Sequence, residues 1–446
     1  MKDNFIKDKT FIKALLNHAL PICLQMIMFA SVSAADAFML GGIEQNSMAA
    51  VSLASQIQFV QNLVLSGTIS TTALLGAQYW GKKDTNSIDD IFALSIRFTA
   101  FISFMFFVGC YFFPRQLMML YTNEEVLIEI GVKYLRITAF AYLISGLTQS
   151  FITMTRISDH IKTAAIISCS AVVINIVLNS IFIFNFNMSA EGAALATVIA
   201  RIIEFSLAVI MSYRPTYLRL KFNKLLSFNK LLTLDFLKCM FPLMGASLLW
   251  GIGFTSYTSF MGHLGTDAAA ANSITAVIRD LICASSDGIA QGGGIMVGNE
   301  LGSANLEKGK LYGKRMAKIA FILGAICSLL MMIVTPAAMR LVKLTPQAQY
   351  YLKQMMIVMS IYMIGRYVNT IVINGVLTAG GDTMYDMYSL FVTMWCIALP
   401  LAALGTYVFH WPVVVIYACT CLDEVGKIPW TMYHFSKYKW VKDLTR

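Results

Sequence analysis

An aspartate lies in the middle of the first apolar stretch of the chain, where an ionised side chain needs an explanation. Asp36 is flanked by serines and alanines, which let neighbouring helices approach closely. An ionised carboxylate at the centre of a bilayer costs about 2.5–3.5 kcal/mol even on the lenient insertion scale, so burial favours its protonated form. A carboxylate that exchanges a proton or holds Na⁺ suits ion-coupled transport. The alternative is a structural acid that pairs with a neighbouring helix.

Two asparagines further along the chain have the spacing of one helix face. Asn175 and Asn179 are four residues apart in an apolar segment, so their side chains point the same way on a helix. Their amide oxygens could accept a hydrogen bond from a protonated Asp36 or ligate Na⁺. Hydrogen bonding between packed helices explains them equally well.

The second half of the chain also carries charges inside apolar segments. Arg279, Asp280 and Asp287 lie in one such segment, and Arg366 lies in another. Because Asp280 and Asp287 are two helical turns apart, they lie near one face and should point toward the protein interior or a cavity. They form either a second ion or proton site or a neutralised structural network, and we favour the network. Glu204 and Glu424 have basic neighbours, and we expect them to form ion pairs with those neighbours, which are Arg201 and Lys427. The alternative is that the two glutamates line the transport cavity.

The composition identifies the solvent that surrounds these residues. Apolar residues make up 57% of the 446 residues and charged residues only 13%. A soluble domain carries about 25% charged residues, so much of this chain must face lipid. The net charge of +10 is spread between apolar runs rather than gathered in one stripe, which argues against a nucleic-acid partner. The nine cysteines lie in apolar segments without a metal-binding spacing, so we expect no metal site and no cofactor from them.

Apolar segments long enough to cross a bilayer follow one another along the whole chain. A bilayer core about 30 Å thick takes roughly 20 residues of helix. Twelve such segments lie near residues 14–41, 48–78, 88–113, 125–154, 162–186, 190–212, 237–261, 268–298, 310–334, 348–378, 384–408 and 412–436. The first segment is too long for the apolar core of a cleavable signal peptide. We therefore expect an all-α integral membrane protein with about twelve transmembrane helices.

The basic residues of the short loops predict the orientation of these spans. With a cytoplasmic N-terminus, 23 Lys and Arg residues fall on the cytoplasmic side and three on the other. Positively charged loops stay in the cytoplasm, so we expect both termini there. The basic linker 213–236 joins an N-terminal six-helix lobe, residues 1–212, to a C-terminal six-helix lobe, residues 237–446.

The two halves repeat each other at a constant offset. Pro21 recurs as Pro242 and Gly81 as Gly302, with the same separation in both pairs. Since six spans return the chain to the same side, the halves have the same orientation and form a parallel repeat. Transporters built this way place the substrate between the halves and expose it to each side of the membrane in turn.

Short motifs in both repeats resemble the multidrug and toxic compound extrusion (MATE) family over essentially the whole chain. The motifs are Leu20-Pro21, Asp36-Ala-Phe-Met-Leu-Gly41, Ala77-Gln-Tyr-Trp-Gly81, Gly262-His-Leu-Gly265, Gly298-Asn-Glu-Leu-Gly302 and Ala379-Gly-Gly-Asp-Thr383. The resemblance is closer to the DinF branch than to the NorM branch, because Trp250 stands where NorM-type members carry a glutamate. It implies cation coupling through Asp36, Asn175, Asn179 and Thr197, although an aspartate is common at the position of Asn179.

The resemblance implies a secondary-active efflux transporter rather than an enzyme. It would exchange H⁺ or Na⁺, with Na⁺ held at the Asp36 cluster if Na⁺ is the ion, for small organic and often cationic compounds. A flippase for lipid-linked oligosaccharides or polysaccharides, from the same broader superfamily, is the alternative. Its cavity should be strongly basic, whereas acids at least equal bases inside these spans. The resemblance also implies a monomer in the bacterial inner membrane. The sequence contains no Gly-Lys-Ser/Thr phosphate loop, so we do not expect this chain to use ATP directly.

Overall fold

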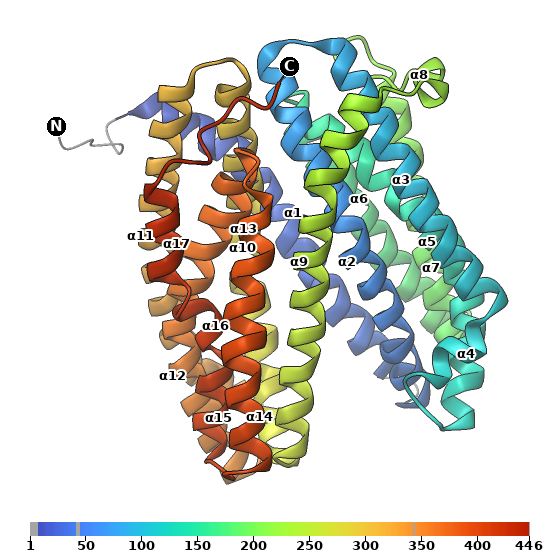
Figure 1. Cartoon of the computed structure of the whole chain (residues 1–446). Coiled ribbons are helices and arrows are strands. Elements are labelled where there is room, and N and C mark those ends of the chain that lie inside the picture. Colours follow the sequence, from blue (N-terminus) through green and yellow to red (C-terminus); the bar gives the residue numbers. More distant parts are fainter. Residues whose placement is uncertain (1–7, 42–44, 342–343, 446) are drawn as a thin grey trace. The chain divides into compact units, whose positions relative to one another are not determined.

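The computed structural model describes residues 8–41, 45–341 and 344–445. The side chains of residues 31–38, 40, 41, 45 and 341 also lie outside the described part. Every regular element in the described ranges is a helix (Figure 1). The all-helical fold class predicted from the sequence is therefore confirmed.

Six long helical segments form the first half of the chain. They are α1 (Lys9–Gly41), α2 (Gln45–Lys82), α3 (Thr85–Phe112), α5 (Glu125–Ile157), α6 (Ile161–Ser180) with its π-helical extension η2 (Ile181–Asn185), and α7 (Ser189–Ser212). The short α4 (Pro114–Met119) follows α3, and α8 (Phe222–Leu226) lies within the predicted linker. Each long segment coincides with one predicted span.

The second half has the same number of segments, with more breaks. They are α9 (Lys230–His263), α10 (Thr266–Gly302), α11 (Leu306–Leu341), α12 (Pro346–Asn369) with η3 (Thr370–Leu377), α13 (Thr383–Leu390) with η4 (Phe391–Ala398) and α14 (Leu399–Tyr407), and α15 (Val413–Thr420), α16 (Leu422–Val425) and α17 (Ile428–Ser436). The last predicted span is thus three short helices in sequence.

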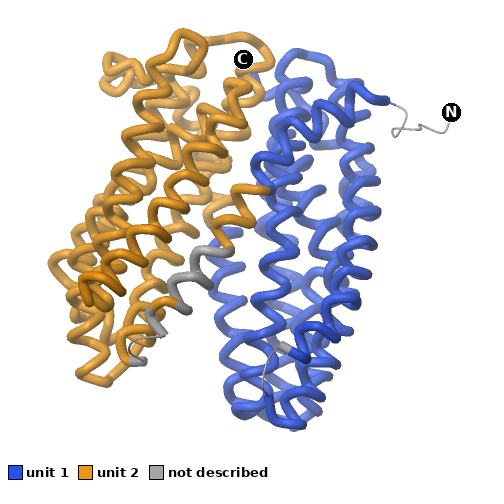
Figure 2. Tube along the Cα trace, turned by 180° about the vertical axis from the view of Figure 1, so that it is seen from behind, with its two compact units in different colours: residues 1–23, 245–446 blue, residues 24–244 orange. Residues whose placement is uncertain are grey.

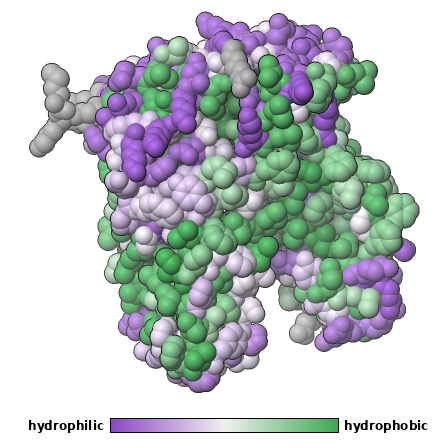
Figure 3. Space-filling model, in the orientation of Figure 1, coloured by the Kyte–Doolittle hydropathy of each residue, from purple (hydrophilic) through white to green (hydrophobic). Residues whose placement is uncertain are grey.

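The lengths and composition of these helices suit a membrane. Within the described ranges, nine helical segments are long and apolar enough to cross a bilayer. The other three predicted spans correspond to α5, α10 and the run α15–α17, which carry buried polar or charged side chains. Figure 3 shows hydrophobic side chains over much of the visible helix surface, while hydrophilic side chains gather at the helix ends.

The helices gather into two compact units (Figure 2). Unit 1 contains residues 1–23 and 245–446, and unit 2 contains residues 24–244. The boundaries fall inside α1 and α9, whereas the predicted lobes end in loops. The lobes 1–212 and 237–446 follow the repeat of the sequence and stay a prediction. The predicted linker 213–236 contains α8 and the first turns of α9.

Both units are built around their fourth helical segment. In unit 2, α5 packs against α2, α3 and α7, and α6 packs against α7. In unit 1, α12 and η3 pack against α10, α11 and the last three helices, and α14 packs against α15. The starts of α2 and α10, of α3 and α11, and of α5 and α12 are all separated by the offset that relates Pro21 to Pro242. The repeat predicted from short motifs therefore extends to helix boundaries and packing partners.

The first turns of α1 are held in unit 1 by polar contacts at its N-terminus. Asp8 caps the helix, because its Oδ1 accepts hydrogen bonds from the backbone N–H groups of Thr10 and Phe11, each at 3.1 Å. Its Oδ2 lies 2.6 Å from Nη1 of the buried Arg315 on α11. Hydrogen bonds from Thr10 and Arg315 hold the pKa of Asp8 well below its usual range, so the cap stays ionised at neutral pH.

Two glycines let α1 and α10 approach closely inside unit 1. A Cβ atom added at Gly288 would lie 2.5 Å from the backbone nitrogen of Cys23, and one at Gly292 would lie 2.8 Å from Cα of Ala19. Glycines four residues apart form the small-residue surface that packed membrane helices use. The contact leaves no room for a larger side chain on α10.

We expect Gly288→Leu to destabilise the protein, because the new side chain must push α1 and α10 apart. Overpacking of this kind typically costs about 1–3 kcal/mol. The measurement is the melting temperature of the purified protein in detergent micelles. Gly262→Leu is the matched control, because a Cβ atom at Gly262 has no atom within 4 Å. Equal melting temperatures for the two variants would contradict the close contact.

Candidate functional site

Three of the four predicted coupling residues lie together in unit 2. Nδ2 of Asn179 donates to Oδ1 of Asn175 at 3.3 Å, and Nδ2 of Asn175 donates to Oγ1 of Thr197 at 3.4 Å. The Thr197 hydroxyl donates in turn to the backbone oxygen of Ala193 at 2.9 Å. Asn175 and Asn179 are buried. Residues of α6 and α7 thus form one polar chain.

The fourth predicted coupling residue, Asp36, belongs to α1 by its backbone. Its side chain lies outside the described residues, so its place in the cluster stays a prediction. The polar chain is directional, because each member donates toward Thr197. Hydrogen bonds that point the same way polarise one another. The α-helical geometry of α6 gives way to the π-helical η2 two residues after Asn179, and such turns are frequent at functional sites.

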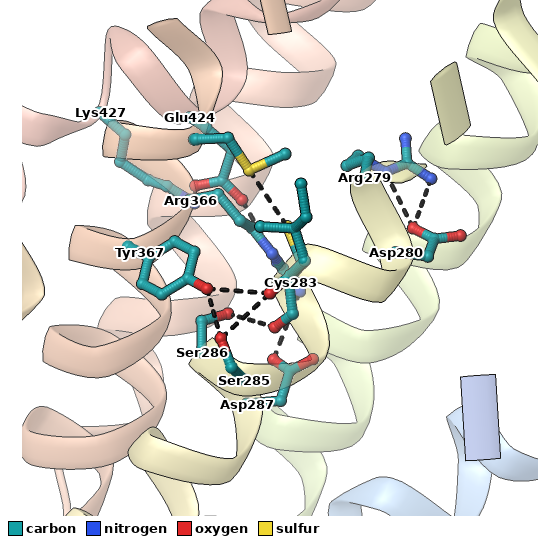
Figure 4. A network of polar contacts seen from close by, with 12 residues as sticks. Arg279, Asp280, Cys283, Ser285, Ser286, Asp287, Arg366, Tyr367, Glu424 and Lys427 are labelled. Atoms are coloured by element: carbon teal, nitrogen blue, oxygen red, sulfur yellow. Dashed lines mark hydrogen bonds and ion pairs between the residues drawn. The ribbon is translucent and has the colours of Figure 1, made fainter. Parts of the chain in front are cut away.

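The four charged residues predicted in unit 1 form two separate ion pairs (Figure 4). Nη2 of Arg279 lies 2.8 Å from Oδ1 of Asp280, its neighbour in the sequence. Nη2 of Arg366 lies 3.5 Å from Oδ1 of Asp287. The Asp280 side chain is 60% exposed, whereas that of Arg366 is only 18% exposed. Asp280 and Asp287 therefore bind different arginines.

Glu424 of α16 is the residue that joins the helices around Arg366. Its Oε1 lies 3.4 Å from Nη1 of Arg366, and its Oε2 lies 3.9 Å from Nζ of Lys427. Nδ2 of Asn369 donates to both Oε2 and the backbone oxygen of Glu424, each at 2.7 Å. A Cβ atom at Gly365 would lie 2.8 Å from the Glu424 backbone. Glu424 thus connects α12 with α16.

The ion pairs expected for the two glutamates are present. Lys427 lies beside Glu424, as described above, and Nη1 of Arg201 lies 2.7 Å from Oε2 of Glu204. Both glutamates are buried. Elsewhere in unit 2, Arg156 of α5 donates through Nη2 to Oε1 of Gln25 at 2.6 Å. Each unit therefore buries charged side chains between its helices, and the two units do so at different positions of the repeat.

A small cavity lies next to the charged residues of unit 1. Its volume is about 40 Å³, and its walls include Trp250, Arg279, Tyr257 and Asp423. The guanidinium of Arg279 also lies over the ring of Phe254, 4.6 Å from its centre. The cavity walls come from α9, α10, α12, η4, α15, α16 and the turn at Cys421.

Sequence reasoning missed three polar residues of unit 1, namely Asn369, Asp423 and Tyr257. Asp423 had a signal, since it stands beside Glu424 in an otherwise apolar segment. Asn369 resembles any other asparagine until its bond to the Glu424 backbone is known. Tyr257 is one of 19 tyrosines, and the sequence does not distinguish it.

A family model described as MatE matches residues 21–181 and 242–404, which together exceed half of the chain. The two matched ranges begin at Pro21 and Pro242, the pair of prolines that relates the two halves. The two matches therefore follow the internal repeat.

Curated relatives match most of the chain at low identity. The chain is 25% identical over 403 residues to the "Uncharacterized transporter YisQ" of Bacillus subtilis, which covers 89% of this chain and 88% of that protein. It is 22% identical over 365 residues to the "Probable multidrug resistance protein YoeA" of the same organism, with 80% and 78% covered. It is 23% identical over 309 residues to the "Multidrug resistance protein NorM" of Vibrio parahaemolyticus, with 68% and 67% covered.

Solved structures share the fold. The MATE transporter VcmN of Vibrio cholerae, in its bent form, superposes with a TM-score of 0.86 at 16% identity, over 96% of this chain and 97% of that chain. A MOP superfamily transporter from Pyrococcus furiosus superposes with a TM-score of 0.82 at 17% identity, over 95% and 96%. The helix arrangement described above is thus found in known transporters.

We expect Arg366→Met to destabilise unit 1 strongly, because it leaves the buried carboxylate of Glu424 without its arginine. Removing one partner of a buried ion pair typically costs about 3–5 kcal/mol, and the partial exposure of Asp287 places this case toward the lower end. Denaturant unfolding in micelles measures the loss. Glu125→Gln is the control, because both partners of its ion pair with Arg115 are exposed, and exposed pairs contribute only about 0–1 kcal/mol.

A second substitution tests the cause of the loss. If the unpaired carboxylate destabilises Arg366→Met, then adding Glu424→Gln should restore part of the lost free energy of unfolding. Equal unfolding free energies for Arg366→Met and Glu125→Gln would show that Glu424 does not depend on Arg366.

Proposed function

The chain belongs to the MatE family, whose members are membrane transporters and not enzymes, and we propose that it exports small organic compounds in exchange for H⁺ or Na⁺. The relatives named as multidrug resistance proteins support export of this kind. The internal repeat supports alternating access, because two related halves of the same orientation can rock about a substrate between them.

The hydrogen-bonded chain of Asn179, Asn175 and Thr197 is the observation that carries the coupling proposal. Polar side chains inside membrane helices are costly unless they bond to one another or serve an ion pathway. This chain of side chains lies in unit 2, which also contains the part of α1 with Asp36. In the proposed cycle, Asp36 takes up the coupling cation, and the amides of α6 supply hydrogen bonds or oxygen ligands beside it. No further cofactor is required.

The proposed branch of the family rests on single positions. Trp250 stands where a NorM-type transporter would have a glutamate, and Asn175 and Thr197 stand where a DinF-like cluster would have them. We therefore place the chain nearer to the DinF branch. Asn179 replaces a common aspartate there, so Asp36 would be the only predicted carboxylate of the cluster.

A flippase of the same superfamily fits the interior of unit 1 less well. Such a protein must hold a pyrophosphate, which requires an excess of basic side chains. The charged side chains around Glu424 and the cavity are three basic and five acidic ones, namely Arg279, Arg366, Lys427, Asp280, Asp287, Asp386, Asp423 and Glu424. The excess of acid favours a protein that handles cations.

The expected substrates are small organic compounds, many of them cationic. We propose that the protein acts as a monomer in a bacterial inner membrane with both termini in the cytoplasm. Export then runs from the face that carries the basic linker to the opposite face. The inward gradient of H⁺ or Na⁺ supplies the free energy.

The test of antiport is the uptake of a fluorescent organic cation into inverted membrane vesicles under a separately imposed H⁺ or Na⁺ gradient. The wild type should take up the dye under one of the two gradients. Asp36→Asn should abolish gradient-driven uptake, because an amide neither exchanges a proton nor carries the charge that attracts Na⁺.

Asp443→Asn is the matched control for this experiment, since Asp443 is exposed near the C-terminus and should leave uptake unchanged. Unchanged uptake in Asp36→Asn would exclude Asp36 as the coupling residue. If neither gradient drives uptake in the wild type, the substrate class or the coupling is wrong, and the flippase becomes the better hypothesis.

The proposed orientation makes a separate prediction. Alkaline phosphatase folds only outside the cytoplasm, so its fusion after Arg446 should be inactive, whereas its insertion at Asn123 between α4 and α5 should be active. Enzyme activity per fusion protein in intact cells is the measurement. The reverse pattern would place both termini outside the cytoplasm and reverse the direction of transport.

A further inference from the structure

We propose that Asp423 and Tyr257 form a second proton-binding site, which lies wholly within unit 1 and is separate from the Asp36 cluster. The use of this site in transport rests on the proposed antiport. The existence of the site rests only on the geometry of the cavity in unit 1.

Asp423 lies where the last helical segment is interrupted. The helix α15 ends at Thr420, α16 runs from Leu422 to Val425, and α17 begins at Ile428. Only 4% of Asp423 is exposed, and its side chain lines the cavity. Its Oδ1 atom is buried and has no hydrogen-bond partner among the residues that the structure describes. A buried carboxylate oxygen without a partner is costly and calls for a proton, a water or an ion.

Tyr257 supplies the second polar group of the cavity. It comes from α9, and its hydroxyl is also buried without a hydrogen-bond partner in the described part of the chain. Tyr257 lines the same cavity as Asp423, and the two groups do not meet in a hydrogen bond of normal geometry. Two buried polar atoms that face one small cavity can both be satisfied by a proton on the carboxyl group or by a bound water.

The size of the cavity decides what it can hold. A single water needs at least about 10–15 Å³ of such space, whereas pockets for organic ligands measure about 300–1,000 Å³. The cavity of about 40 Å³ therefore accepts water and a proton but excludes an organic substrate. Because the guanidinium of Arg279 lines the same space, a metal ion there would lie beside a fixed positive charge.

The neighbouring acid, Glu424, is already neutralised. Arg366, Lys427 and Asn369 all contact Glu424, as described above. Within the described ranges, no ion pair within 4 Å forms at Asp423. The same is true of Asp386, which lies near Lys427. Asp423 is thus the uncompensated acid that faces the cavity.

The balance of charge favours a proton at this position. The titratable and charged groups around Asp423 come from every helix packed against it and are Tyr257, Arg279, Asp280, Asp287, Tyr362, Arg366, Asp386, Tyr417, Cys421, Glu424 and Lys427. With all carboxyl groups ionised, five acids oppose three bases. Uptake of one proton from water converts the Asp423 carboxylate to a neutral acid and removes one of the two excess negative charges.

Protonation also changes which group donates between α9 and α16. Ionised Asp423 can only accept a hydrogen bond from the Tyr257 hydroxyl, whereas the protonated acid can donate one to the Tyr257 oxygen. The proton thus alters a contact between two helices that are far apart in the sequence. If the protein is an antiporter, this contact would let unit 1 respond to the same proton gradient.

The direct test is infrared difference spectroscopy of the purified full-length protein between acidic and alkaline pH. A protonated carboxyl group gives a C=O stretching band that an ionised carboxylate lacks. Asp423→Asn should lose one such band. Asp386→Asn is the matched control, because it removes the other unpaired acid near Lys427 and should retain that band. Identical difference spectra for the wild type and Asp423→Asn would overturn the proposal.

A second variant keeps the test decisive if Asp423→Asn fails to fold. Tyr257→Phe retains the acid and removes the hydroxyl oxygen to which we propose that the protonated acid donates, so the Asp423 band should remain and shift to higher frequency. An unshifted band would exclude the Tyr257 contact.

The test separates this site from the proposed antiport. The infrared band of Asp423 requires no substrate and no gradient. If the dye experiment fails and the band is present, the antiport is wrong and the site stands. If the dye follows a gradient and the band is absent, the antiport stands without this site.

Discussion

The contact between Arg366 and Glu424 is the interaction on which the interior of unit 1 depends. A carboxylate as buried as that of Glu424 is shielded from bulk water, so it must be paired or hydrogen-bonded, or it must carry a proton. Arg366 answers that requirement for Glu424, and Asn369 binds both the Glu424 side chain and its backbone oxygen. The interrupted last segment can therefore pack against α12 with the side chain and the backbone oxygen of Glu424 both hydrogen-bonded. The neighbouring Asp423 has no such partners among the described residues, and its side chain lines a cavity.

The two units share an arrangement of helices, but the polar side chains in their interiors differ. At the offset of the repeat, Arg366 corresponds to Ser145, whose hydroxyl donates only to a backbone oxygen of its own helix. Glu424 corresponds closely to Glu204, which pairs with Arg201 on the same helix. The starts of the corresponding helices and their main packing partners are thus shared by the two halves. The charged side chains inside them differ, so the two halves offer different groups to the chemistry of transport.

Much of this fold can be predicted from sequence, because a bilayer imposes simple requirements. The length of an apolar segment predicts its span, and a shared offset between Pro21 and Pro242 predicts the repeat. The partner of each charged side chain inside the spans cannot be predicted in this way. Asp280 and Asp287 share a helix face, yet Asp280 binds the adjacent Arg279 and Asp287 binds Arg366 of another segment. Helical periodicity gives the direction of a side chain and says nothing about which neighbour reaches it. The walls of the cavity beside Asp423 come from six helical elements and the turn at Cys421, so no local pattern could reveal it.

The packing of α1 against α10 also constrains how the protein is made. Cys23 contacts Gly288, and more than half of the chain is synthesised between these two residues. At a rate of about 5–20 residues per second, the ribosome needs roughly 13–50 s to reach Gly288 from Cys23. During that time the first turns of α1 cannot make this contact with α10. The first helix is therefore synthesised well before this partner, which arrives in the second half of translation.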